Sequence, residues 1–126
     1  MMTGLKIKMN INADEIVETK KLKLAQRFLT SEVRRLSDKY IPFDNGPLKN
    51  TAIESIDSIT YIQPYAKRQF YENKGYGTQG TAKGGLRGKQ WTNRMWADRG
   101  KEITKSVANL IGGKVKWLLL KVLETL

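Results

Sequence analysis

The 126-residue sequence contains no cysteine and no histidine. The lack of cysteine excludes disulfides and thiolate metal sites. The lack of histidine removes the commonest general base and the commonest metal ligand of proteins. No apolar run approaches the roughly 18 residues that a membrane-spanning helix needs, and no apolar stretch of a signal peptide follows the first residues. We therefore expect no membrane contact.

Catalytic patterns are also scarce. The twelve acidic residues are scattered along the chain. Asp98 and Glu102 are spaced i,i+4, but Arg94, Arg99 and Lys105 surround them, which is typical of a salt-bridged helix surface. No glycine-rich phosphate-binding pattern stands between a strand and a helix. We expect no enzyme activity, no cofactor, no metal and no small-molecule substrate.

Basic residues are abundant instead. Lys and Arg number 23, so the formal net charge is +11 and the sequence pI is about 10.0. A surplus of this size indicates an anionic neighbour such as nucleic acid, a membrane surface or an acidic protein. The length is typical of a single domain, which we place at residues 1–126.

The first third of the chain predicts a strand and a long helix. Apolar and polar residues alternate from Leu5 to Ile11, as in a half-buried strand. Asn12 is suited to cap a following helix, with Glu15 as the capping-box partner. The helical stripe that follows has two interpretations, a start directly after this cap or a start near Thr19. Its apolar members are Leu22, Ala25, Leu29, Val33, Leu36 and Tyr40.

The segment Ile59–Glu72 is the centre of the sequence. Ile59 and Tyr61 alternate with Thr60 and Ile62, which predicts a strand. A second strand is expected at about residues 52–56, and the short connection favours antiparallel pairing. The aromatic and Arg content after this strand is typical of interfaces. A core strand whose aromatic residues are simply buried is the equally weighted alternative.

Residues 73–88 form a glycine-rich segment with basic residues and no acid. We expect an extended, exposed loop that stays mobile until a neighbouring subunit or DNA holds it. Lys74, Lys83 and Arg87 are its candidate contacts to anions.

The last third predicts two helices. Trp96, Gly100, Ile103, Val107 and Leu110 share one face of a helix that Gly112 and Gly113 would end. Trp91 and Met95 lie on another face, for which core burial is the default. Residues 114–126 repeat apolar positions at helical spacing, so we expect a C-terminal amphipathic helix.

Together these elements predict an α+β fold. An antiparallel β-sheet packs against a long α-helix, and a second, Trp-containing helix and a C-terminal amphipathic helix complete it.

The order of these pieces resembles the minor capsid and neck proteins of tailed bacteriophages with long non-contractile tails, the head–tail joining family. The resemblance is carried by YIPFDNGPLKNTA at residues 40–52, ITYIQPYAKRQFYE at 59–72 and WTNRMWADRGKEITKSVANLIGG at 91–113. The sequence departs from the family at Gly46-Pro47-Leu48, where a polar residue is commoner between glycine and leucine. Residues after Gly113 have no clear counterpart.

The resemblance implies a structural protein of the virion neck, made in the host cytoplasm and located at the head–tail junction. Such a protein forms a homo-oligomeric ring that joins the DNA-filled head to the tail and lines the DNA channel. Its expected partners are other copies of itself, other neck, connector and tail proteins, and double-stranded DNA bound without sequence preference. The candidate residues for subunit contacts are Tyr65, Arg68, Phe70, Tyr71, Tyr76 and Trp91. The candidate DNA-facing residues are Lys74, Lys83 and Arg87.

Three alternatives remain open at this stage. The first is a tail terminator protein of the same junction. The second is a sequence-nonspecific nucleic-acid-binding protein, for which the net charge is the argument. The third is a small basic ribonuclease toxin that works without histidine, with Lys67, Arg68 and Tyr71 as its candidate residues.

Overall fold

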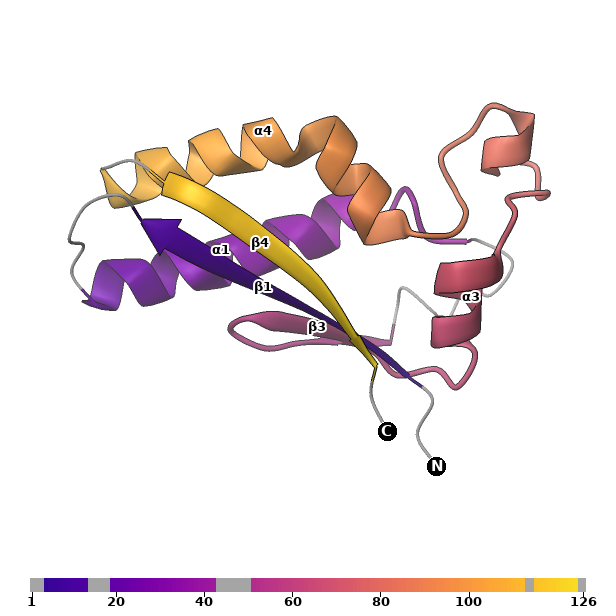
Figure 1. The fold of residues 1–126 in the computed structure, drawn as a ribbon, viewed down its shortest axis with the longest axis horizontal. Helices are drawn as coiled ribbons and strands as arrows, with labels where there is room; N and C mark the ends of the chain where they lie inside the picture. The colour runs from indigo at the N-terminus through magenta and orange to yellow at the C-terminus, as the bar shows by residue number, and fades with distance from the viewer. Residues whose placement is uncertain (1–3, 14–18, 43–50, 113–114, 125–126) are drawn as a thin grey trace.

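A computed structural model describes residues 4–13, 19–42, 51–112 and 115–124 (Figure 1). The described part contains four strands, three α-helices and one 3-10 helix. The strands are β1 (Leu5–Ala13), β2 (Ala52–Glu54), β3 (Ser58–Tyr61) and β4 (Val115–Glu124). The helices are α1 (Thr19–Ser37), α3 (Ala66–Glu72), η1 (Thr81–Lys83) and α4 (Trp91–Ile111).

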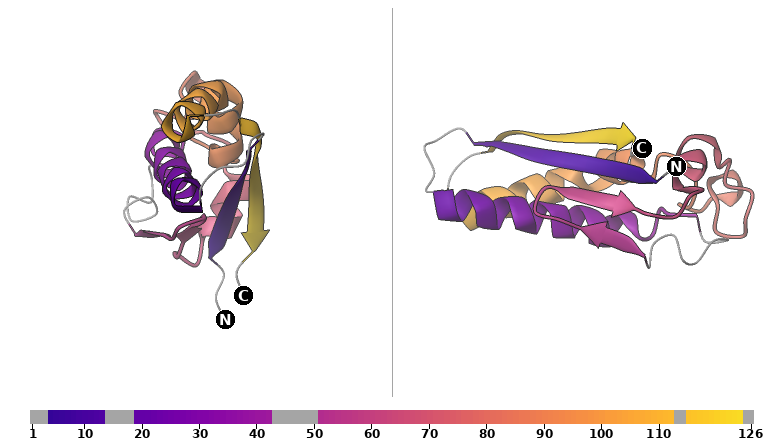
Figure 2. Two further views of the ribbon diagram at one scale, coloured as in Figure 1. Left: turned by 90° about the vertical axis from the view of Figure 1, so that its left-hand side faces the viewer. Right: turned by 90° about the horizontal axis from the view of Figure 1, so that it is seen from below.

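The strands form one antiparallel sheet in the order β2-β3-β1-β4. The long helices α1 and α4 pack together on one side of this sheet (Figure 2). The predicted α+β class, with an antiparallel sheet on a long helix and a second helix that contains Trp, is therefore confirmed. The alternation in β1 is confirmed too, because Leu5, Ile7 and Met9 are fully buried.

The helical stripes supply most of the remaining core. Ala25, Leu29, Val33 and Leu36 of α1 are buried, as their spacing predicts. On α4, the buried positions are Trp91, Thr92, Met95, Gly100, Ile103, Val107 and Ile111. The expected helix stop is confirmed, because Gly112 takes the left-handed conformation with φ +68° and its N–H returns to the last carbonyls.

The capping prediction for Asn12 is wrong. Asn12 lies inside β1, where it pairs with Trp117, and helix α1 begins at Thr19. The partner that sequence analysis lacked is β4, about a hundred residues away, which extends β1 to Ala13. The later start of α1 was one of the two interpretations of the stripe. Glu15 lies outside the described residues.

The predicted C-terminal amphipathic helix is also wrong. Residues Val115–Glu124 form strand β4, which pairs antiparallel with the whole length of β1. An apolar run of this length matches a helical stripe and a strand buried on one face almost equally well. The long uncovered edge of β1 decides in favour of the strand, because pairing satisfies its backbone groups.

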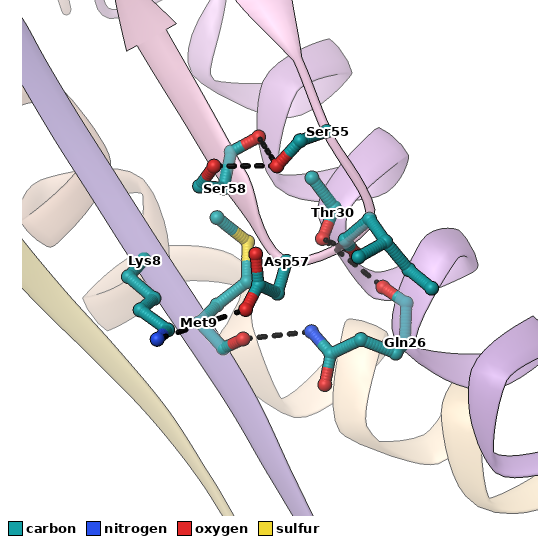
Figure 3. A network of polar contacts seen from close by, with 8 residues as sticks. Lys8, Met9, Gln26, Thr30, Ser55, Asp57 and Ser58 are labelled. Carbon is teal, nitrogen blue, oxygen red and sulfur yellow. Dashed lines mark hydrogen bonds and ion pairs between the residues drawn. The ribbon is translucent and has the colours of Figure 1, made fainter.

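The β2–β3 hairpin is held to the rest of the fold by a polar network (Figure 3). Thr30 Oγ1 of α1 donates a hydrogen bond to the carbonyl of Ile56 in the hairpin turn at 2.9 Å. Gln26 Nε2 donates to the carbonyl of Met9 at 2.7 Å. Lys8 Nζ lies 3.8 Å from Asp57 Oδ2. Helix α1 therefore fixes both the turn and the middle of β1.

Candidate interaction surfaces

Three buried aromatic rings anchor helix α3, on which the candidate contact residues Arg68 and Tyr71 lie. The Phe70 ring of α3 meets the Trp91 indole edge-on, with centroids 4.8 Å apart. Trp91 meets Tyr61 of β3 in the same manner at 5.4 Å. All three side chains are fully buried. Helix α3 is short and has no side-chain cap, so these contacts hold it against the sheet and α4.

Two of the six predicted subunit-contact residues are therefore misplaced. Phe70 and Trp91 have no exposed surface and belong to the core of the single chain. Their neighbours differ, because a helix turns successive residues to different sides. Tyr71 is 43% exposed and Tyr76 is 70% exposed. Tyr65 is half-buried and packs against the core.

We call the three exposed side chains Arg68, Tyr71 and Tyr76 the contact patch. Arg68 links the other two, because it lines one groove with Tyr76 and a second groove with Tyr71. Arg68 is weakly held by Glu72, with Nε 3.6 Å from Oε2 at an exposed i,i+4 spacing. The patch therefore presents two large aromatic rings and a guanidinium that can exchange this weak pair for another partner.

The segment from 73 to 88 has more structure than the sequence predicted. It contains η1 and a β-bridge between Gly80 and Arg87. Its backbone closes on itself through four hydrogen bonds of 2.9–3.0 Å, which are Ala82 N–H to Gly75 O, Thr81 N–H to Arg87 O, Gly85 N–H to Gly80 O and Arg87 N–H to Gln79 O. The segment is mostly exposed, as expected, but it is folded on itself rather than extended, because glycine allows backbone-to-backbone contacts that need no apolar burial.

Glycine is required where two arms of this segment touch. A Cβ atom added to Gly80 would lie 2.0 Å from the carbonyl oxygen of Gly75. Gly75 itself has φ +72°, and a Cβ there would meet the Thr81 backbone. These two positions therefore exclude any larger residue, and they fix the fold of the segment.

Arg87, a predicted DNA-facing residue, has internal partners. Its Nη1 donates to the carbonyls of Asp38 and Ile41, both at 2.7 Å, and its Nε donates to Gln79 Oε1 at 2.9 Å. Arg87 thus ties the glycine-rich segment to the end of α1. Lys74 and Lys83 are exposed. Of the three predicted DNA-facing residues, these two present their side chains to solvent.

Sequence analysis missed a second arginine clamp. Arg94 of α4 donates to the carbonyls of Leu86 at 2.6 Å and Lys89 at 2.7 Å, and its guanidinium lies 5.5 Å from the Tyr40 ring centroid. Burial lowers the pKa of Arg94. Tyr40 in turn donates to Asp98 Oδ2 at 2.7 Å. Burial, and then this hydrogen bond, raises the pKa of the Tyr40 hydroxyl.

The predicted salt-bridged surface of α4 is therefore only partly as expected. Arg99 pairs with Glu102 at 2.8 Å. Arg94 instead donates to the carbonyls of Leu86 and Lys89, and Asp98 accepts from Tyr40. In the sequence, this clamp is indicated by Arg94 and Asp98, which are four residues apart. An ordinary ion pair on a helix surface has the same spacing.

Positive charge is also concentrated on the first half of α1. Lys20, Lys21, Lys23 and Arg27 are exposed. Within the residues that the structure describes, none of these four forms an ion pair, whereas Arg34 and Arg35 farther along α1 pair with Glu54 and Glu32. This half of α1 and the Lys74–Lys83 region are thus two separate basic surfaces.

The acidic side chains of the described residues do not gather into a metal-binding cluster. Across residues 4–13, 19–42, 51–112 and 115–124, no group of three is placed to hold a metal ion. Among the helices described, none is long and apolar enough to cross a membrane.

Comparison with protein-family models gives a match over most of the chain. A family model of minor capsid proteins matches residues 5–110, which include all elements from β1 to nearly the end of α4. Neither a search of curated proteins nor a search of solved structures finds a match. Strand β4 lies beyond the matched region.

Proposed function

We propose that this chain, which belongs to the minor capsid protein family of phages, is a neck component whose copies form a ring between head and tail. Membership of the family makes it a structural component of the virion. The position at the head–tail junction, the ring and the passage of DNA through it are our proposal. Its other expected partners are the connector and tail proteins on either side.

The observation that carries this proposal is the contact patch. Exposed tyrosine and arginine side chains are the residue types that dominate binding energy at protein interfaces. Here Arg68 and Tyr71 lie on helix α3, which the buried Phe70 and Trp91 rings hold in place, and Tyr76 lies in the hydrogen-bonded glycine-rich segment, so a partner would meet a preformed surface. A preformed surface loses little conformational entropy on binding.

The experiment is the size distribution of the purified chain, measured by mass photometry and negative-stain electron microscopy. We expect ring-shaped oligomers, and we expect Tyr76→Ala to shift them toward monomers. Leu86→Ala is the matched control, because Leu86 is an exposed apolar residue of the same segment outside the contact patch. A monomer at every concentration tested would contradict the ring.

A second candidate function, nonspecific binding of nucleic acid, is favoured by the basic half of α1. The net charge of +11 supports it as well. The two functions are compatible, because a ring that surrounds DNA presents a basic surface to it. A tail terminator would share these features. Immunogold labelling of intact particles would distinguish a terminator on the tail side from a neck ring on the connector side.

A further inference from the structure

The two edge strands of the sheet, β2 and β4, each lack a neighbouring strand on one side among the residues described. Strand β4 pairs only with β1, and β2 pairs only with β3, among the residues described. Strand β4 has ten residues, and no described element lies beyond its outer edge (Figure 2). A long uncovered edge exposes a row of backbone donors and acceptors, which soluble proteins usually shield.

The opposite edge carries exposed apolar side chains. Ile53 of β2 is 56% exposed, and Ile56 in the adjoining turn is 39% exposed. Ser55 N–H donates to Ser58 O at 2.8 Å. Because antiparallel pairs alternate between bonded and non-bonded positions, Ala52 and Glu54 direct their backbone groups outward. The network of Figure 3 holds this hairpin in place, so the edge is preorganised for a partner.

The even number of strands determines whether the two edges pair parallel or antiparallel. The sheet has four antiparallel strands, so β2 and β4 run in opposite directions. When a rotation places β4 of one copy beside β2 of another, the new pair is therefore antiparallel as well. Contacts between two different surfaces of identical subunits generate rings where the rotation closes.

We propose that β4 of one copy pairs antiparallel with β2 of a second copy of this chain, so that their sheets join edge to edge. The inference rests on the proposed ring and adds a second subunit contact, between sheet edges, to the contact patch. Pairing of β4 with β4 would join only two copies and leave β2 uncovered. Repeated β4–β2 pairing covers both edges of every subunit, as closure does in a barrel.

The observed register limits where the strands can pair. Ile53 lies opposite Thr60, Thr60 opposite Lys6, and Lys6 opposite Leu123. These four positions share one face of the sheet. A register shift of one residue would place Ile53 opposite a β4 position of the other face. The helices of neighbouring copies would then lie on opposite sides of the joined sheet, which is incompatible with copies related by a ring rotation. Within the described residues, Ile53 can therefore pair with Leu123 or with one of the alternate positions Lys121, Leu119 and Trp117, which lie on the same face.

Cysteine trapping tests the pairing directly, because the chain has no cysteine of its own. The variants are Ile53→Cys and, on β4, Leu123→Cys, Lys121→Cys, Leu119→Cys and Trp117→Cys, each purified alone and then mixed with Ile53→Cys under mild oxidation with diamide. Directly opposite residues of antiparallel strands have Cα separations that suit a disulfide. We expect Ile53→Cys mixed with one of the β4 variants to give a covalent dimer on a non-reducing gel.

The double variant of that same pair should give a ladder that extends beyond the dimer. Lys101→Cys is the control, since Lys101 is exposed on α4, in the helix layer. It should give no such dimer with Ile53→Cys. Covalent dimers of a β4 variant alone would show β4–β4 pairing and overturn the proposal. Absence of every mixed dimer would overturn it equally.

The same experiment separates this inference from the proposed function. Rings that form without any β2–β4 disulfide would contradict the edge pairing and leave the ring in place. Disulfide-linked chains that never close into rings would keep the edge pairing and contradict the neck ring.

Discussion

The Phe70 ring and the Trp91 indole meet edge-on, with their centroids 4.8 Å apart and an interplanar angle of 83°. This contact joins α3 to the first turn of α4, and the Trp91–Tyr61 contact continues it to the sheet. It also explains why neighbouring aromatic residues of one short helix have different roles. Phe70 is directed into the fold, and Tyr71 remains at the surface.

We predict that Phe70→Ala and Tyr71→Ala have separable effects. Removal of a fully buried phenylalanine should lower the free energy of unfolding by about 3–5 kcal/mol. Tyr71→Ala should cost at most about 0.5–1.5 kcal/mol, through its edge contact with Phe70, and should weaken assembly. Urea unfolding followed by circular dichroism measures the first effect, and mass photometry the second. Equal loss of stability in the two variants would show that the aromatic residues of α3 act as one core unit.

The second prediction concerns Arg87 as a structural clamp. Arg87→Ala removes the guanidinium that donates to the carbonyls of Asp38 and Ile41, and it should cost about 1–3 kcal/mol of unfolding free energy. Arg87→Lys should restore only part of this, because an ammonium does not reproduce the planar fork of a guanidinium. Limited trypsin digestion should then cleave faster at Lys83. The control is Lys83→Ala in the urea series, which should leave stability unchanged. An unchanged digestion rate in Arg87→Ala would refute the clamp.

The third prediction compares two glycines of the same segment. Gly80→Ala places a methyl group against the Gly75 carbonyl and should open the segment. Gly84 has φ +83° with open space around it, so Gly84→Ala meets only the cost of a left-handed alanine, about 1 kcal/mol. Amide hydrogen exchange at Thr81, Ala82 and Gly85 reports the opening. We expect fast exchange in the first variant and near-native protection in the second; the reverse order would contradict the described backbone packing.

Local patterns in the sequence predicted the elements whose signal is local. The stripe of α1, the stop at Gly112 and the alternation of Ile59 and Tyr61 each follow from residues within one or two turns or one strand. The core role of Met95 followed from the same reasoning.

The errors share a physical cause, which is pairing between distant segments. Asn12 and the run from 115 to 124 take their conformation from each other across the sheet, and no local period carries that information. Arg87 likewise finds its carbonyl partners 46 and 49 residues away. Of the predicted contact residues, Phe70 was misjudged because an aromatic-rich segment does not itself tell which ring faces inward, whereas the buried Trp91 follows the core burial that its helix face indicated.

The fourth prediction concerns alkaline pH. The Tyr61 hydroxyl is fully buried and has no hydrogen-bond partner in the described structure. Burial raises its pKa and outweighs the opposing effect of the neighbouring Trp91 side chain, which forms no hydrogen bond of normal geometry with it, so folding favours the neutral form. The stability that depends on this protonation is complete below the unfolded pKa of about 10 and is lost as pH rises above it. Tyr61→Phe should therefore flatten the decline of unfolding free energy above pH of about 10.

At neutral pH, Tyr61→Phe should be neutral or slightly stabilising, because it removes a buried group without a partner. Tyr40→Phe is the matched comparison. Its hydroxyl donates to Asp98, so the variant should lose about 1 kcal/mol at neutral pH. Urea unfolding from pH 7 upward checks both. A Tyr61→Phe variant that loses as much stability as Tyr40→Phe would show that the Tyr61 hydroxyl has a partner after all.

The last prediction asks which basic surface faces DNA. Lys74→Gln/Lys83→Gln and Lys20→Gln/Lys23→Gln each remove two positive charges, so the two variants have equal net charge and sample different surfaces. For a ring whose glycine-rich segment lines the channel, we expect the first variant to bind duplex DNA more weakly. The slope of log K against log salt should fall by about 0.9 for each phosphate that the variant no longer neutralises. The α1 variant should show only the general effect of a lower net charge. Fluorescence anisotropy on two unrelated duplexes over a salt series measures both. A larger decrease in the α1 variant would place DNA on the helix, and a strong preference for one duplex would contradict the neck function, because a channel meets every sequence in turn.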